Sequence, residues 1–174
     1  MKIGDTAPSF ALPGVDGATH RLEDLAAAAA LVVVQMCNHC PYVIGYQERM
    51  NALAREFGPQ GVQFVGINSN DAARYPSDSL DNMVIRAREV ALPFPYLYDE
   101  DQALAKALGA ERTPEFFLFD GERKLVYHGR LDDNLEDPEQ VEQAYLAEAI
   151  EAVLAGHLPA VAETPAVGCS VKWR

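Results

Sequence analysis

The chain has 174 residues, with 14 Lys or Arg and 26 Asp or Glu, which gives a formal net charge of −12. This length suits a single domain, and 49% apolar with 23% charged residues excludes the disordered and fibrous classes. The negative charge disfavours sequence-independent binding to nucleic acids or anionic lipid surfaces, because both are negatively charged themselves. We therefore expect neither a nucleic acid nor a membrane as a partner.

Three features favour a cytoplasmic protein. The longest uninterrupted apolar stretch, residues 25–34, has ten residues, well short of the ~20 that cross a bilayer. Asp5 and Pro8 stand where a signal peptide would carry its apolar core. Three cysteines are a small and odd number, which argues against a disulfide framework. The oligomeric state has no signature in the sequence.

The N-terminal part predicts a hairpin followed by a buried strand. Residues 9–12 and 18–21 are two extended pieces separated by Pro-Gly-Val-Asp-Gly. A short helical turn is expected over residues 22–30, because it ends in five alanines. The β-branched run Leu31–Met36 then predicts a central parallel strand that is buried on both faces.

The rest of the chain alternates between helix and strand patterns. An amphipathic helix is expected over residues 41–57, where apolar side chains form one stripe. Further strands are expected at 62–68, 96–98, 115–119 and 125–130, and further helices at 79–90, 102–108 and 137–155. The alternation predicts an α/β fold whose mixed central sheet is covered by helices on both faces, with the N-terminal β-hairpin as an extension.

Cys37, Asn38, His39 and Cys40 lie between the predicted central strand and the amphipathic helix. A helix N-terminus stabilises a thiolate through its unpaired backbone N–H groups and its dipole. We expect Cys37 to be the exposed nucleophile and Cys40 the resolving thiol, which attacks a mixed disulfide on Cys37. His39 is expected to tune the pair as an imidazolium, with a solvated helix-terminal histidine as the alternative. The chemistry needs no cofactor beyond the redox-active disulfide.

The same two cysteines could instead be half of a zinc site. Zinc would need two further ligands, and Cys169, His20, His128 and His157 lie at no finger-like spacing. The acidic residues at 132–137 lack the pattern of a calcium loop and predict a solvated face with a helix N-cap. We expect no metal site, and a zinc-stabilised binding module stays as an alternative.

Several motifs together carry a resemblance to a known family. They are Gly4-Asp5-Thr6-Ala7-Pro8-Ser9-Phe10, Cys37-Asn38-His39-Cys40-Pro41, Val65-Gly66-Ile67-Asn68, Thr113-Pro114 and Gly129-Arg130-Leu131-Asp132. With them, residues 3–155 resemble the thioredoxin superfamily, in its redoxin branch with the alkyl hydroperoxide reductase C/TSA type and TlpA-like thiol-disulfide oxidoreductases. The resemblance implies a thioredoxin fold over residues 1–156, followed by a C-terminal tail, 157–174, that packs on the domain.

The resemblance also implies roles for residues far from the cysteines. Pro114 matches a cis-proline that faces the redox pair, and the backbone of the residue matching Thr113 pairs with a bound substrate chain. We assign Thr113 and Asn38 to substrate binding. Asp71 follows a strand at the place where TlpA-like proteins carry an acid, so we expect it to accept the proton of Cys40, with a turn cap as the alternative.

The function implied is that of a thiol-disulfide oxidoreductase acting on a protein or small-molecule disulfide or dithiol. The alternative is an antioxidant peroxiredoxin-like thiol peroxidase. Peroxiredoxins carry P-x-x-x-T-x-x-C, but Val34 and Ala30 stand at the Thr and Pro positions before Cys37, so the hydroxyl that would help bind peroxide is missing. Cys169, in a C-terminal Gly-Cys-Ser, is either an auxiliary thiol or an inert cysteine.

Overall fold

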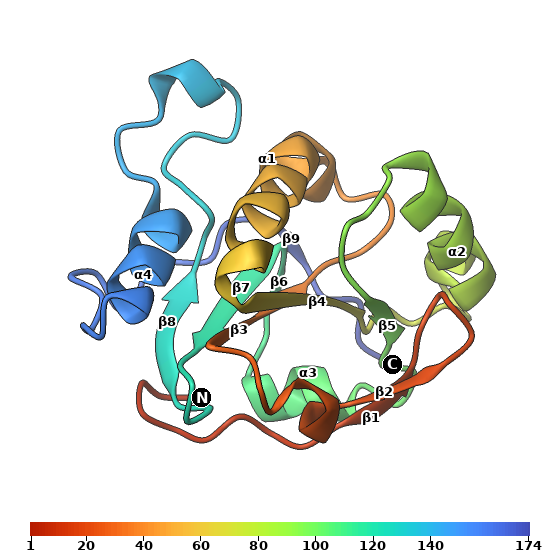
Figure 1. The fold of residues 1–174 in the computed structure, drawn as a ribbon. Coiled ribbons are helices and arrows are strands. Elements are labelled where there is room, and N and C mark those ends of the chain that lie inside the picture. Colours follow the sequence, from red (N-terminus) through yellow and green to blue (C-terminus); the bar gives the residue numbers. More distant parts are fainter.

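The computed structural model describes residues 1–174. A five-stranded mixed sheet forms its centre (Figure 1), in the strand order β5-β4-β3-β7-β8. These strands are β3 (Ala30–Gln35), β4 (Val62–Asn68), β5 (Tyr96–Tyr98), β7 (Glu115–Phe119) and β8 (Leu125–Gly129). Strand β3 is central, pairing parallel with β4 and antiparallel with β7. The predicted α/β class and mixed sheet are confirmed.

Apolar side chains of β3 alternate between two hydrophobic cores, because successive side chains of a strand point to opposite faces. Val32 and Val34 belong to the larger core and Leu31 and Val33 to the smaller one. Helices cover both faces: α1 (Pro41–Phe57), α2 (Leu80–Glu89) and α4 (Tyr145–Leu154) contribute to the larger core, and α3 (Ala103–Leu108) to the smaller. None of these helices is both long and apolar enough to span a membrane.

Strands β1 (Ala11–Pro13) and β2 (Thr19–Arg21) pair antiparallel, so the predicted N-terminal hairpin is confirmed. The helical turn predicted after it is wrong beyond Leu25. Only Leu22–Leu25 forms a 3-10 helix, because the side chain of Arg123 binds the carbonyl oxygens of Leu25 and Ala28, which a longer helix would need. The last alanine of the run, Ala30, already belongs to β3.

The predicted last helix also begins too early. Asp137 caps only a 3-10 turn, Pro138–Gln140, and α4 starts at Tyr145. The carboxylate of Asp133 accepts hydrogen bonds of 3.1 Å from the backbone N–H groups of Glu142 and Gln143. Because these N–H groups are held by a side chain, the segment stays a loop until α4 begins.

The C-terminal tail folds back over the domain. Its short strand β9 (Cys169–Ser170) pairs antiparallel with β6 (Arg112–Thr113) in a separate two-stranded sheet. Val171 is buried beside this sheet, and the backbone N–H of Arg174 donates to the side chain of Gln102. The tail thus brings Cys169 to the segment that precedes β7.

Candidate functional site

The three cysteines meet at one cleft of about 200 Å³. The loop after β3 contributes Cys37 and Cys40, residues 70–78 form another wall, and Thr113 of β6 and the tail from Cys169 complete it. All three cysteines are free thiols. Strands β3 and β4 are parallel neighbours, so the loop after β3 and the segment after β4 lie at the same end of the sheet. This topology explains why the two segments line one cleft.

Cys40 is the N-cap residue of α1, and Pro41 takes the first helical position, where its missing N–H is not needed. The Cys40 sulfur lies 3.1 Å from the carbonyl oxygen of Thr113, which accepts a hydrogen bond from the protonated thiol. Cys37 lies before the helix, with its sulfur 3.6 Å from the Thr113 hydroxyl oxygen. Thr113 therefore contacts both thiols of the pair.

The two thiols of the pair differ in acidity. The adjacent Cys37 thiol, helped by the Cys169 thiol and the Thr113 side chain, lowers the pKa of Cys40 despite burial. The adjacent Cys40 sulfur, together with burial and the nearby Asp78 carboxylate, raises the pKa of Cys37. The helix begins one residue after Cys40, so Cys40 and not Cys37 occupies its positive end.

The predicted exposure of Cys37 is wrong. The exposed fraction of Cys37 is 4% and that of Cys40 is 5%. Between them, His39 is exposed to solvent at the rim of the cleft. Within the motif, only His39 is positioned to meet a macromolecular partner directly.

Asn38 is fully buried and anchors the loop between the cysteines. Its side-chain amide donates to the Ser77 carbonyl oxygen at 2.8 Å, and its side-chain oxygen accepts a 2.8 Å hydrogen bond from the Tyr96 hydroxyl. The expectation that Asn38 binds substrate is therefore wrong, since its polar atoms are taken up inside the protein. Its role is to position the loop.

Asp78, which was not selected from the sequence, is the buried carboxylate at this site. It accepts a 2.9 Å hydrogen bond from the backbone N–H of Asn38, a 3.2 Å bond from the Asn68 amide and a 2.9 Å bond from the Asn70 amide. Its sequence context, Pro-Ser-Asp-Ser before a helix, is that of an ordinary turn. Only the contact with the loop after β3 distinguishes it.

Asp71, the expected proton acceptor, is buried but does not line the cleft. Its carboxylate lies 3.5 Å from the Arg74 guanidinium and 3.8 Å from that of Arg174. Its backbone N–H donates to the carbonyl oxygen of Lys172. The structure thus assigns Asp71 to fastening the tail, in place of proton transfer at the cysteines.

The Thr113-Pro114 peptide bond is cis, as the resemblance implied. The preceding segment is held by buried Glu115, whose carboxylate accepts 2.7 and 2.8 Å hydrogen bonds from the backbone N–H groups of Glu111 and Arg112. The backbone edge of Thr113, expected to pair with a substrate chain, pairs with Cys169 of the chain's own tail.

Comparison with known proteins agrees with this fold. The family model described as Redoxin matches residues 2–145, most of the chain. The protein belongs to the Redoxin family. At the family level these matches support a thiol-disulfide oxidoreductase, since a curated relative of this redoxin is the thiol-disulfide oxidoreductase ResA of Geobacillus thermodenitrificans, 27% identical over 72% of this chain and 67% of the relative.

Two solved structures cover the whole redoxin, tail included. An uncharacterized conserved protein from Geobacillus kaustophilus is 46% identical, covering 99% of this chain and 93% of its own, with a TM-score of 0.94. A hypothetical protein from Sinorhizobium meliloti is 38% identical, covering 100% of this chain and 96% of its own, also with a TM-score of 0.94. Their similarity extends beyond the Redoxin match into the tail.

This redoxin offers no set of side-chain ligands for a zinc-stabilised module. No group of three or more His, Cys, Asp or Glu side chains is placed to hold a metal ion. A structural zinc site uses four such ligands. The paired cysteines are therefore better explained by thiol chemistry.

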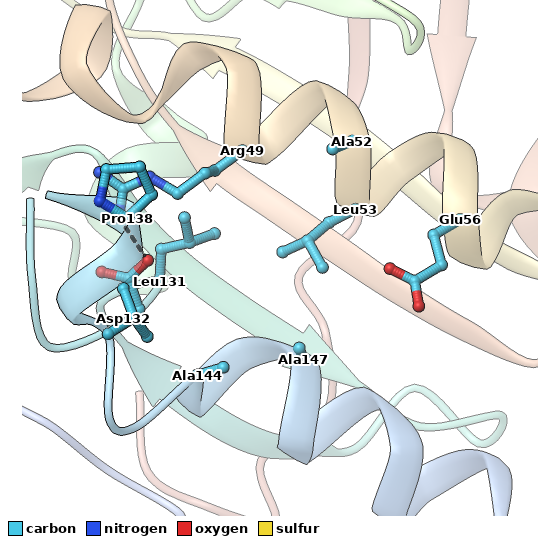
Figure 2. Close-up of a pocket in the computed structure, with 10 residues that line it drawn as sticks. Arg49, Ala52, Leu53, Glu56, Leu131, Asp132, Pro138, Ala144 and Ala147 are labelled. Carbon is cyan, nitrogen blue, oxygen red and sulfur yellow. Dashed lines mark hydrogen bonds and ion pairs between the residues drawn. The ribbon is translucent and has the colours of Figure 1, made fainter.

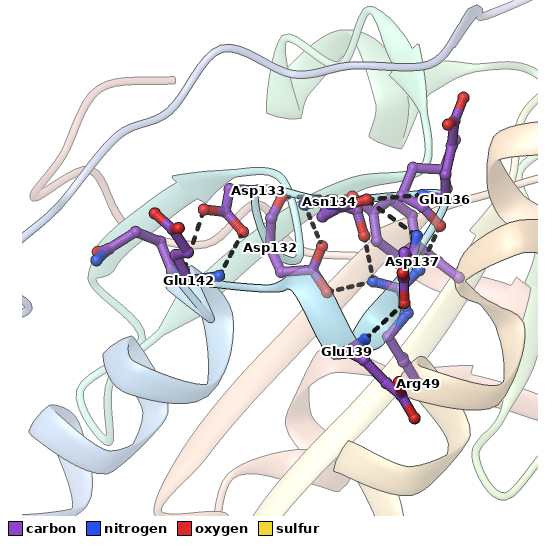
Figure 3. Close-up of polar contacts among 11 residues, drawn as sticks. Arg49, Asp132, Asp133, Asn134, Glu136, Asp137, Glu139 and Glu142 are labelled. Carbon is purple, nitrogen blue, oxygen red and sulfur yellow. Dashed lines mark hydrogen bonds and ion pairs between the residues drawn. The ribbon is translucent and has the colours of Figure 1, made fainter.

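A second hollow, of about 310 Å³, lies between α1 and the segment that leads into α4 (Figure 2). Arg49 and Asp132 form a 2.6 Å ion pair there. Figure 3 shows the neighbouring carboxylates of Asp133 and Asp137, which accept hydrogen bonds from backbone N–H groups. The predicted solvated acidic face is therefore wrong for Asp132, which is buried, and no cysteine lines this hollow.

Proposed function

We propose that this redoxin exchanges disulfides through the pair Cys37 and Cys40. The observation that carries the proposal is the position of the Cys40 sulfur, at the N-cap of α1 and beside the Cys37 thiol in the same cleft. The lowered pKa of Cys40 makes it the thiol of the pair that ionises first in this proposal. The thiolate is the reactive form in thiol-disulfide exchange.

The first step is attack by the Cys40 thiolate on one sulfur of a substrate disulfide. A bond forms between that sulfur and Cys40, the substrate S–S bond breaks, and the other substrate sulfur leaves as a thiolate. Cys37 then attacks the Cys40 sulfur, its proton passes to a departing thiolate, and a Cys37–Cys40 disulfide forms. The substrate gains two electrons and two protons, one from Cys37 and one from solvent, and the reverse sequence oxidises a dithiol.

The structure gives a reason for this order of events. The largest effect that raises the pKa of Cys37 is its hydrogen bond to Cys40. Once Cys40 is bound in a mixed disulfide, its negative charge is gone and that effect ends. Cys37 becomes easier to deprotonate at the stage when it has to attack.

Two neighbours complete the proposed site. His39, exposed at the rim, is proposed to tune the pair, because an imidazolium near the thiolate favours the reduced form. Thr113 is proposed to shape the place where the substrate sulfur arrives, since it contacts both thiols. The proposed substrate is a disulfide in a small molecule or on a protein segment that fits the cleft.

One observation favours the thiol peroxidase as a second candidate. The Thr113 hydroxyl, 3.6 Å from the Cys37 sulfur, supplies a hydroxyl beside a thiol, which Val34 at the threonine position of the peroxiredoxin motif does not. In that case Cys37 would be oxidised by a hydroperoxide to a sulfenic acid, which Cys40 would convert to the disulfide with release of water. The raised pKa of Cys37 counts against it.

The two functions separate in one experiment. Reduced wild type, Cys37→Ser and Cys40→Ser are each mixed with a model protein disulfide or with hydrogen peroxide, and thiol loss is followed by stopped flow. The proposal expects fast reaction with the disulfide that Cys40→Ser abolishes. Faster reaction with peroxide, together with a sulfenic acid trapped on Cys37 in Cys40→Ser, would support the peroxidase and overturn the proposal.

A further inference from the structure

Strand β9 is seated on the thiol cleft by contacts built into the sequence. Cys169 lies opposite Thr113 in the register, and the backbone N–H of buried Val171 donates to the Glu111 carbonyl oxygen at 2.9 Å. A Cβ atom at Gly168 would lie 2.2 Å from the Thr113 carbonyl oxygen, so only glycine fits this approach. The C-terminal tail therefore covers the cleft in one defined position.

The position of β9 brings the Cys169 thiol close to Cys37 and Cys40. The carbonyl group of Thr113 contacts the Cys40 sulfur on one side, and the backbone of Thr113 pairs with Cys169 on the other. Cys37, Cys40 and Cys169 line the same cleft. A disulfide bond requires two sulfurs to come within about 2.05 Å, and Cys40 and Cys169, both beside Thr113, approach each other by rotation of their side chains.

Access differs between the three sulfurs. Cys37 and Cys40 are 4% and 5% exposed, whereas Cys169 is half-buried in the tail. Exchange requires the attacking thiolate to reach a sulfur of the disulfide. A folded protein reductant therefore approaches Cys169 far more readily than a Cys37–Cys40 disulfide beneath β9.

We propose that Cys169 is a relay thiol, which moves the disulfide of the buried pair to the surface. The proposal rests on the exchange function above. In the oxidised protein the Cys169 thiolate attacks Cys40; the Cys40–Cys169 bond forms, the Cys37–Cys40 bond breaks, and Cys37 takes up the proton that Cys169 lost. A dithiol protein then attacks Cys169, releases Cys40 as a thiolate, and closes its own disulfide as it leaves, so that it is oxidised and the redoxin is reduced.

The charges around Cys169 restrict the relay to the oxidised protein. In the reduced protein, burial and then the hydrogen bond and charge of Cys40 raise the pKa of Cys169 to about 11. A disulfide at Cys40 removes both of these contributions from Cys40. The cations of Lys172 and Arg112, which favour the Cys169 thiolate, remain. Cys169 therefore becomes more nucleophilic when there is a disulfide to attack.

The first test removes Cys37 and leaves the other two thiols. Cys37→Ser is treated with diamide, a thiol oxidant, and the products are mapped by non-reducing peptide mass spectrometry. We expect a Cys40–Cys169 disulfide as the main product. Adding Gly168→Ala should slow its formation about tenfold, as expected when docking of β9 is weakened by roughly 1.4 kcal/mol. Adding Cys169→Ser and Val167→Cys, which moves the thiol to an exposed tail position, should abolish it.

The second test follows reduction of the oxidised protein by two reagents. A thioredoxin, as the dithiol protein, should reduce oxidised Cys169→Ser at least about tenfold more slowly than oxidised wild type, whereas dithiothreitol should reduce both at similar rates because it is small. Equal rates with thioredoxin, or no Cys40–Cys169 disulfide in Cys37→Ser, would overturn the relay while leaving the exchange function intact. Failure of wild type to form a Cys37–Cys40 disulfide with any disulfide substrate would instead overturn the exchange function.

Discussion

The backbone N–H of Asn38 donates a 2.9 Å hydrogen bond to the buried carboxylate of Asp78. This contact joins the loop between the two cysteines to the segment after β4. It also places a negative charge close enough to raise the pKa of Cys37. One buried acid thus fixes the geometry of the redox loop and helps to decide which of its thiols is ionised.

Replacing this acid tests both effects. Asp78→Asn should lower the pKa of Cys37, because the negative charge that disfavours its thiolate is lost. The free energy of unfolding should fall by about 1–3 kcal/mol, because the new amide faces the Asn70 amide without an acceptor. Thiol titration and denaturant unfolding measure the two results. Asp71→Asn, a matched buried acid outside the cleft, should leave the pKa of Cys37 unchanged, and an equal shift in both variants would contradict the assignment.

The reactivity of Cys40 should have an unusual pH dependence. Its lowered pKa means that the thiolate is present throughout the neutral range and is lost as the pH falls through about 4. Alkylation of reduced Cys37→Ala/Cys169→Ala is the reference, because loss of both side-chain donors should move the midpoint to higher pH. For wild type we expect a rate that is flat at neutral pH and falls only in acid. A rate that rises with pH through about 8.5, as for an ordinary cysteine, would contradict the assignment.

The ion pair of Arg49 and Asp132 should stabilise the fold without affecting the thiols. Arg49→Met leaves a buried carboxylate without its partner and should cost about 3 kcal/mol of unfolding free energy. The double variant Arg49→Met/Asp132→Leu should recover part of this loss, since no unpaired charge remains. Chemical denaturation gives both values. A change in the rate of Cys40 alkylation under native conditions would show that the two regions are coupled, against this expectation.

The tail should be loosened by a change far from the cysteines. The side-chain amide of buried Gln102 donates a 3.0 Å hydrogen bond to the Lys172 carbonyl oxygen. Gln102→Leu removes it and should cost about 1–3 kcal/mol. Hydrogen exchange should then be faster at Val171, whose N–H pairs with Glu111, and Cys40 should be alkylated faster. Unchanged exchange at Val171 would mean that this contact does not hold the tail.

Local sequence patterns were sufficient to predict the sheet and the helix that carries the redox motif. The β-branched run in β3 and the apolar stripe of α1 are properties of adjacent residues, and both elements lie within one residue of their predicted bounds. The position of the motif between them follows directly. The cis peptide bond before Pro114 came from family resemblance, because a Thr-Pro sequence alone does not distinguish cis from trans.

What the sequence did not predict depends on contacts between distant segments. Asp71 and Asp78 look alike as acids in turns, and only the fold shows that Asp78 meets the redox loop while Asp71 meets the tail. How the charge divides between Cys37 and Cys40 depends on contacts with Thr113 and Asp78, which the correctly predicted start of α1 does not reveal. The approach of Cys169 to Cys40 likewise comes from pairing between β6 and β9.

The most direct test of the account is to trap the mixed disulfide. Reduced Cys37→Ser/Cys169→Ser and Cys40→Ser/Cys169→Ser, in which no third thiol can resolve the product, are each reacted with a model protein disulfide at neutral pH, quenched with acid, and mapped by peptide mass spectrometry. We expect the variant that keeps Cys40 to accumulate substrate bound to Cys40, while the variant that keeps Cys37 reacts far more slowly. Rapid accumulation of substrate on Cys37, with little reaction at Cys40, would contradict the assignment of Cys40 as the attacking thiolate.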